Sequence, residues 1–131
     1  RVRAAQETAR VLSRRLVQHE LVGRVLYPKA DGVQLRGPGA VLSFEVAGGL
    51  EAAASVMAAV KLVTPAVSLG ATDTLIEHPA ALTHRLVDAA AKAELGITDG
   101  LLRLSVGLEG VEDLWDDLAR ALAAARVRAA A

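Results

Sequence analysis

Short segments with the periodicity of β-strands alternate with helical segments along this chain, and this alternation constrains its fold more than any other feature. Apolar residues recur at every second position over Ala40–Val46, which is the period of a half-buried strand. Two glycines, Gly48 and Gly49, then turn the chain into a helix expected over about 50–63. Strands separated by helices predict an α+β domain, in which helices cover one face of a small, mostly antiparallel sheet.

The other expected elements follow from the same periodicities. In the helix at 50–63, Leu50, Ala54 and Met57 form one apolar stripe, and Pro65 is expected to stop the helix. The alanine-rich end of the chain is expected to fray. The remaining elements are an amphipathic helix that begins near Ala5 and ends before Gly23, strands at 22–27, 66–69 and 101–106, a loop at 28–39, a helix at 86–95 that ends at Gly96, and a last helix with Val111, Leu114, Trp115, Leu118 and Leu122 on its apolar face.

Composition excludes several classes of function. A length of 131 residues is usual for one domain, and residues 1–131 are expected to form one. Hydrophobic residues make up 53% of the chain, which argues against disorder. Fifteen basic residues balance fifteen acidic ones, so no net charge favours nucleic acid or an anionic membrane, and neither is expected as a partner. Because cysteine is absent, disulfides and thiolate metal sites are excluded, and no uncharged apolar run approaches the ~18 residues that span a bilayer.

Several sequence blocks occur in a characteristic order. The most specific are SLGATDTLIEHP at 68–79, the pair Thr83-His84, and GLLRLSVGLE at 100–109, preceded by Tyr27-Pro28 and by VLSFEVAGGLEAA at 41–53. Together they resemble the end of the Cys/Met metabolism family of pyridoxal-phosphate (PLP) enzymes, whose members usually have YPGL, MLSFEL-x-GG-x-EAA, SLGG-x-ESLIEHPA-x-x-TH and GI-x-DGL-x-RLSVG-x-E. Several blocks in the right order are far more specific than any one of them.

The resemblance implies that the chain acts as part of a larger enzyme. Family members use PLP to catalyse elimination or replacement at the γ or β carbon of sulfur amino acids such as methionine or cystathionine. Residues 1–131 are expected to be the small C-terminal domain of such a fold-type I enzyme. The implied partners are the N-terminal PLP-binding domain of the same polypeptide, the sulfur amino-acid substrate and further copies in a homotetramer. The implied location is the cytoplasm.

The lysine that carries PLP in this family lies in an S-x-T-K segment of the preceding domain. The lysines here are Lys29, Lys61 and Lys92, and none has those serine and threonine neighbours. A covalent link to PLP needs an amine beside the cofactor aldehyde. We therefore expect PLP in the full enzyme, no catalytic or cofactor-binding residue in this chain, and no activity of the chain alone. A chain that opens on Arg1 also suits a piece of a longer polypeptide.

Arg103 is the strongest candidate for substrate binding. In a strand at 101–106 its side chain lies on the face opposite to Leu102 and Leu104. A guanidinium on a rigid strand can hold a carboxylate through two parallel hydrogen bonds. By resemblance, Arg103 matches the family arginine of RLSVG, which binds the substrate α-carboxylate. A solvated or structurally paired arginine would be the default interpretation without the motif.

Two further substrate-binding candidates come from the resemblance. Ser68 matches the serine of the SLG segment, whose hydroxyl can contact a bound carboxylate or the PLP lysine; alone, it would be taken for a turn residue. Asp73 stands where the family usually has a glutamate that faces the distal end of the substrate, and its shorter side chain reaches less far. A loop cap is the alternative role of Asp73. Ala71 and Thr74 resemble the SLGDAETL segment of methionine γ-lyase-like members.

The two histidines of the motif region invite a metal or general-base hypothesis, because histidine titrates near neutral pH. The spacing of His78 and His84 fits no compact metal motif, and by resemblance they are structural loop residues, so no metal is expected. Glu109 is expected to stabilise the start of the last helix through the helix dipole.

A second hypothesis from another class is non-catalytic. The chain could be a stand-alone remnant that has lost its cofactor domain and serves as a binding or oligomerisation module. A start codon immediately before Arg1 would favour this alternative, and a reading frame extending upstream through S-x-T-K would favour the enzyme.

Overall fold

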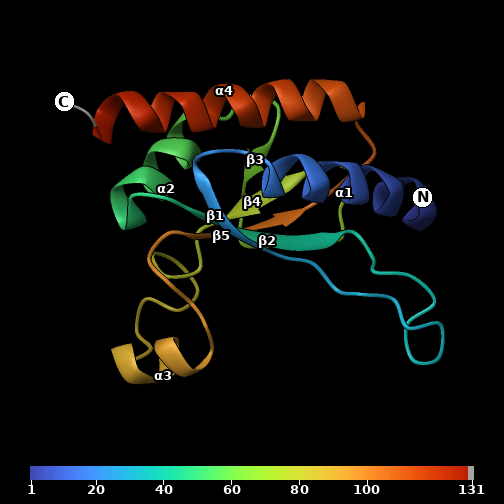
Figure 1. The fold of residues 1–131 in the computed structure, drawn as a ribbon, viewed down its shortest axis with the longest axis horizontal. Helices are drawn as coiled ribbons and strands as arrows, with labels where there is room; N and C mark the ends of the chain where they lie inside the picture. The colour runs from blue at the N-terminus through green and yellow to red at the C-terminus, as the bar shows by residue number, and fades with distance from the viewer. Residues whose placement is uncertain (130–131) are drawn as a thin grey trace.

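The computed structural model describes residues 1–129 and confirms the α+β class (Figure 1). Three long helices lie together on one side of a sheet, and a short fourth helix lies on the other side. The elements in chain order are α1 (Val2–Val17), β1 (Val22–Leu26), β2 (Val41–Val46), α2 (Gly49–Ala59), β3 (Thr64–Pro65), β4 (Leu75–Glu77), α3 (Ala89–Glu94), β5 (Leu101–Ser105) and α4 (Val111–Ala129).

The five-stranded sheet has the order β1-β2-β5-β4-β3. Neighbouring strands are antiparallel except β3 and β4, which are parallel, so the expectation of a mostly antiparallel sheet is confirmed. The last strand in sequence, β5, occupies the centre between β2 and β4. A residue on β5 is therefore flanked by two segments that lie far from it in sequence.

The hydrophobic core fills the space between the sheet and the helices α1, α2 and α4. Alternate residues of the central strands point into it, including Leu42, Phe44, Leu102, Leu104 and Ile76, and all of them are buried. The α4 positions Leu114, Leu118 and Leu122 meet them from the helix side, as the apolar stripe predicts. The opposite face of the sheet, turned away from α1, α2 and α4, is called the distal face below.

The helix after the diglycine is shorter than predicted, and a different stripe of it is buried. Gly48 and Gly49 both have positive φ, which glycine adopts without the strain a side chain would cause. The helix ends at Ala59 because the next backbone N–H groups, at 61–63, donate to the carboxylate of Asp117 instead. The buried positions are Ala52, Ala53, Ser55 and Val56, whereas Leu50 is half exposed. These smaller side chains allow α2 to pack closely on α4.

The prediction of a strand at 66–69 is wrong, because the strand in this region ends at Pro65. Strand β3 comprises Thr64 and Pro65, at the edge of the sheet where a proline without an N–H is tolerated. Residues 66–69 form a loop instead, and the motif segment contains a strand that was not predicted, β4. Both strands are too short for their periodicity to be recognised, and they are fixed by backbone hydrogen bonds such as Thr64 N–H to Thr74 O at 2.9 Å.

The second half of the chain otherwise follows the prediction. Helix α3 is shorter than the expected 86–95, because Asp88 caps its start by accepting a hydrogen bond from Ala91 N–H at 2.9 Å. Gly96 follows its end, as expected. The alanine-rich end of the chain was expected to fray, but helix α4 continues through it to Ala129, and only residues 130–131 lie outside the described residues. Within residues 1–129, no helix is both long and apolar enough to cross a bilayer.

Candidate functional site

Four side chains lie in one row across the distal face. The strand register places Leu26 opposite Ser43, Ser43 opposite Arg103, and Arg103 opposite Glu77. Side chains alternate between the two faces of a strand, so Arg103 lies on the face opposite to the buried Leu102 and Leu104, as predicted. The row brings an arginine and a glutamate from neighbouring strands into direct contact.

The Arg103 guanidinium is held by groups on two sides. Its Nη1 lies 2.7 Å from Glu77 Oε2, and its Nη2 donates to the backbone oxygen of Ser68 at 2.9 Å and to that of Val67 at 3.3 Å. The side chain is 24% exposed. A guanidinium carries five N–H groups, and these contacts use at most three of them. The N–H groups not used are one on Nη1 and the one on Nε, and the Nε atom is buried without a partner among the described residues.

Glu77 is a site residue that the sequence analysis missed. Its side chain is 1% exposed, and neither carboxylate oxygen has a hydrogen-bond partner among the described residues. Burying a charge costs free energy unless the charge is paired. The contact with Arg103 therefore offsets the cost of burying the Glu77 carboxylate. The available signal was that Glu77 directly follows the apolar residues Leu75 and Ile76, where a solvated charge would be unexpected.

The motif loop at 66–74 is fixed to the end of β5 and the segment that follows. Gly70 N–H donates to Ser105 Oγ at 2.9 Å. Thr74 donates twice to the Glu109 carboxylate, from its backbone N–H at 2.6 Å and from its hydroxyl at 2.7 Å. Glu109 thus holds the loop, whereas its expected role was to stabilise the start of the last helix through the helix dipole. These bonds give the backbone beside Arg103 a defined position.

Gly107 has to be a glycine for this arrangement to form. A Cβ atom at this position would lie 2.2 Å from the backbone oxygen of Thr72, which is closer than any real contact. Its N–H also donates to the Thr74 hydroxyl at 2.9 Å, and the next residue, Leu108, donates its N–H to Thr72 O at 2.8 Å. The glycine of RLSVG therefore allows the loop and the end of β5 to lie in direct contact.

The structure brings Ser68 together with Arg103 and leaves Asp73 apart from both. Ser68 contacts Arg103 through its backbone oxygen, and its side chain is exposed. Asp73 is exposed at the far end of the loop, and its carboxylate makes no hydrogen bond or ion pair with the described residues. The side chain of Asp73 therefore does not cap the loop, so the alternative structural role lacks a contact that would support it.

The histidines have the positions of structural residues. His78 is buried, and its Nε2 donates to the backbone oxygen of Asp99 at 2.7 Å, which ties the end of β4 to the segment before β5. His84 Nδ1 lies 2.9 Å from the hydroxyl of its neighbour Thr83. In the described part of the chain, no three histidine, aspartate or glutamate side chains are grouped closely enough to hold a metal ion.

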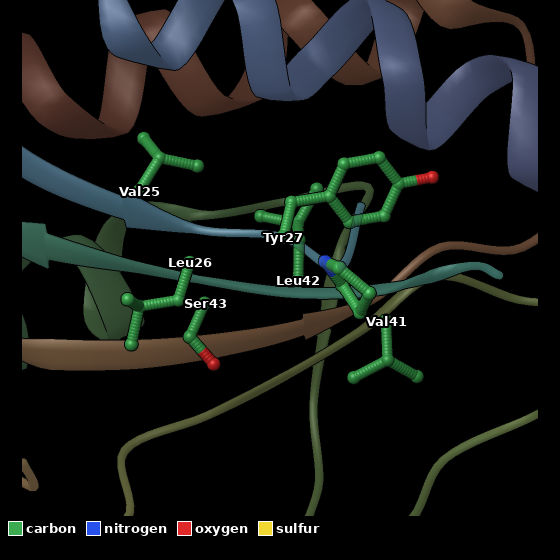
Figure 2. A pocket seen from close by; sticks show the side chains of 7 residues that line it. Val25, Leu26, Tyr27, Val41, Leu42 and Ser43 are labelled. Atoms are coloured by element: carbon green, nitrogen blue, oxygen red, sulfur yellow. The ribbon is translucent and has the colours of Figure 1, made fainter. Parts of the chain in front are cut away.

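An open groove lies at the edge of the sheet, and its lining includes Leu26 and Ser43 of the row described above (Figure 2). Its lining comes from β1, β2 and the residues after β1. Figure 2 shows Val25 and Tyr27 pointing toward the helices, whereas Leu26 and Ser43 point to the distal face. Tyr27 closes the helix side by donating its hydroxyl to Gly39 O at 2.6 Å. Because Ser43 is opposite Arg103, the distal side of this groove adjoins the candidate site.

A comparison with known families identifies the family of this chain. The sequence profile of the Cys/Met metabolism PLP-dependent enzymes matches residues 1–123. The chain belongs to this family. Membership confirms the resemblance stated from the motifs, and the family comprises PLP-dependent lyases and transferases of sulfur amino acids.

Relatives within the family include both lyases and a synthase. L-methionine gamma-lyase of Streptomyces avermitilis is 51% identical over 127 residues, which are 97% of this chain and 28% of that protein. Among solved structures, a cystathionine gamma-lyase from Micromonospora echinospora is 43% identical with a TM-score of 0.87, covering 94% of this chain and 34% of that one. Cystathionine gamma-synthase from Xanthomonas oryzae pv. oryzae, solved with cystathionine, is 40% identical with a TM-score of 0.88. The match covers 97% of this chain and 35% of the synthase.

The chain thus spans about a third of the length of these family members. Its own lysines do not form a PLP site. Lys29 and Lys61 are exposed in loops, and Lys92 lies on the short helix α3, whereas Arg103 and Glu77 lie on β5 and β4. The described residues therefore do not fit a covalently held PLP, and no step of the PLP chemistry is assigned to them.

Proposed function

We propose that residues 1–131 form the C-terminal, substrate-side domain of a full-length PLP-dependent enzyme that eliminates or replaces groups at the γ or β carbon of sulfur amino acids. The observation that carries this proposal is the guanidinium of Arg103, fixed on the distal face between the Glu77 carboxylate and the Ser68 carbonyl with N–H groups to spare. PLP bound elsewhere in the enzyme supplies the electron sink for the reaction. The cofactor of the parent enzyme is thus held outside this chain.

In this proposal Arg103 binds the substrate α-carboxylate. Two parallel hydrogen bonds from a planar guanidinium fix both the position and the direction of a carboxylate, so the rest of the amino acid is aimed as well. Ser68 contacts the same guanidinium through its backbone oxygen, and its exposed hydroxyl is proposed to contact the bound carboxylate. Asp73, whose carboxylate makes no hydrogen bond or ion pair with the described residues, is proposed to face the distal end of the substrate.

The distal face is proposed to pack against the N-terminal PLP-binding domain of the same polypeptide. Apolar side chains on the loops of this side are exposed, among them Val67 at 58% and Leu69 at 59%. They neighbour Ser68, so a domain that covers them would also close the site around Arg103. We further propose that the full enzyme is a cytoplasmic homo-oligomer, in line with the family pattern.

The proposal is tested by expressing the full-length enzyme and assaying L-methionine, cystathionine and an O-acylated homoserine. We expect PLP-dependent release of the γ substituent from at least one of them, detected as the corresponding 2-oxo acid or replacement product. A full-length protein that binds PLP but turns over none of these substrates would contradict the proposed reaction class.

The chain alone is predicted not to retain PLP. Without an amine placed beside the cofactor aldehyde, any complex with PLP is reversible. We expect the visible absorption of a chain–PLP mixture to disappear on dialysis at neutral pH, while the full-length enzyme treated in the same way keeps one PLP per chain. A stoichiometric absorption band that survives dialysis of the chain would contradict the assignment of the cofactor site to another part of the enzyme.

Asp73→Ala is predicted to separate substrates by the charge at their distal end. If Asp73 faces the distal ammonium of cystathionine, kcat/KM for cystathionine should fall by roughly threefold or more, as for an exposed ion pair of up to about 1 kcal/mol. The value for methionine, which has no such charge, should hardly change. Asp113→Ala, another exposed aspartate, serves as the control. An equal effect on both substrates would show that Asp73 has only a structural role.

A further inference from the structure

The carboxylate of Glu77 is buried, and Arg103 is the charged side chain with which it pairs among residues 1–129. Its side chain is 1% exposed, the two residues are direct partners across β4 and β5, and Nη1 lies 2.7 Å from Oε2. We propose that Glu77 is a positioning residue, which fixes the direction of the Arg103 N–H groups and so sets the preference of the site for α-carboxylates. This inference rests on the proposed role of Arg103.

Two fixed anchors determine the orientation of the guanidinium. Glu77 holds Nη1 from β4, and the carbonyl of Ser68 holds Nη2 from the motif loop, 2.9 Å away. A planar group attached at both ends cannot rotate about its last bonds. With only the Nη2 anchor left, the flexible arginine side chain could turn its donors away from the ligand.

Orientation matters here more than charge. Glu77 already neutralises Arg103, so a ligand carboxylate meets a pair without net charge and gains little from long-range attraction. Selection of a carboxylate then depends on two donors pointing along its two oxygens, which is a geometric requirement. Ser43, the other neighbour of Arg103 across the sheet, carries no formal charge, and its register position opposite Arg103 offers no second carboxylate.

The test measures ligand binding by the full-length, PLP-loaded enzyme. The probes are L-norleucine, which has no leaving group, and L-norleucinamide, in which a neutral amide replaces the carboxylate. Calorimetry gives the ratio of the two dissociation constants, which reports the preference for a carboxylate independently of turnover. The variants are Glu77→Gln, which keeps a hydrogen-bond acceptor of the same length, and Glu77→Met, which keeps the length without the acceptor. Glu77→Leu replaces the methionine variant if that variant does not fold.

We expect the Glu77→Met enzyme to lose about 10- to 100-fold of the preference for L-norleucine, the scale expected when a positioned group is displaced by about 1 Å. The Glu77→Gln enzyme should lose clearly less of the preference than Glu77→Met, because its amide oxygen can still accept from Nη1. If Glu77→Met keeps the full preference, or if Glu77→Gln loses as much as Glu77→Met, the positioning role is overturned.

Arg103→Lys separates this inference from the proposed function. If Arg103 binds the carboxylate, the lysine variant loses the preference, and adding Glu77→Met to it has no further effect because Glu77 acts through the guanidinium. If Arg103→Lys keeps the preference, the role of Arg103 itself is wrong. If Arg103→Lys loses it but Glu77→Met does not, only the inference about Glu77 fails.

Discussion

Replacing Arg103 by lysine should lower kcat/KM of the full-length enzyme by about 10- to 150-fold, whatever the side chain of the amino-acid substrate. Lysine keeps one positive charge opposite Glu77 but loses the planar fork, and hydrogen bonds to a charged group contribute about 1.5–3 kcal/mol. Because the proposed contact is with the α-carboxylate that all substrates share, the loss should be the same for methionine and cystathionine. Steady-state kinetics with bound PLP monitored by absorption measures this effect.

Lysine is a cleaner replacement than alanine at this position. The sequence suggests that Arg103→Ala would affect recognition far more than folding, but the structure shows that alanine would leave the buried Glu77 carboxylate without a partner. Breaking a buried ion pair on one side costs about 3–5 kcal/mol of stability. Arg24→Lys is the matched control, since Arg24 is an exposed arginine on β1 that pairs with Glu45 at 3.3 Å. If Arg103→Lys has no larger effect than Arg24→Lys, Arg103 does not bind substrate.

Asp117→Ala should lower the free energy of unfolding of the chain by about 1–3 kcal/mol, since a buried donor left without a partner costs about that much and the Val63 N–H is the fully buried one of the three donors to Asp117. The Asp117 carboxylate accepts hydrogen bonds from the backbone N–H groups of Lys61, Leu62 and Val63, at 2.9 to 3.0 Å, and is also paired with Arg120. Urea denaturation measures the loss. Asp116→Ala, at an exposed position of the same helix, should stay within about 0.5 kcal/mol of the wild type. Equal values for the two variants would contradict the role of Asp117.

The contribution of Asp117 should also depend on pH. Burial by itself raises the pKa of the Asp117 carboxyl, but the three backbone hydrogen bonds and the Arg120 contact outweigh it and lower the pKa in the folded chain. A lowered pKa means that this stabilisation is complete above the unfolded value of about 3.9 and is lost as the pH falls through the folded value. The difference in stability between the wild type and Asp117→Asn should therefore be constant near neutral pH and shrink below about pH 3.9.

The sequence predicts the structure correctly where a local period determines it. The alternation along 101–106 correctly placed Arg103 on the face opposite to Leu102 and Leu104, and the motif order correctly identified the family. It failed where residues distant in sequence decide the outcome. The end of α2 at Ala59 depends on Asp117, which follows more than 50 residues later. The pairing of Glu77 with Arg103 likewise depends on a three-residue strand whose partner lies 26 residues away, and no local period encodes such a contact.

The central place of β5 has a consequence for how the domain forms during synthesis. Strands β2 and β4 both pair with β5 and not with each other, so residues 41–77 leave the ribosome before the strand that joins them exists. Pairings between distant segments form slowly, because a long loop must close before the contacts stabilise it. Translation therefore has to pass Ser105 before Arg103 meets Glu77, and the nascent domain exposes unpaired strand edges until then. We expect ribosome-bound chains that stop before β5 to be sensitive to protease along 41–77, and chains that include α4 to be protected there.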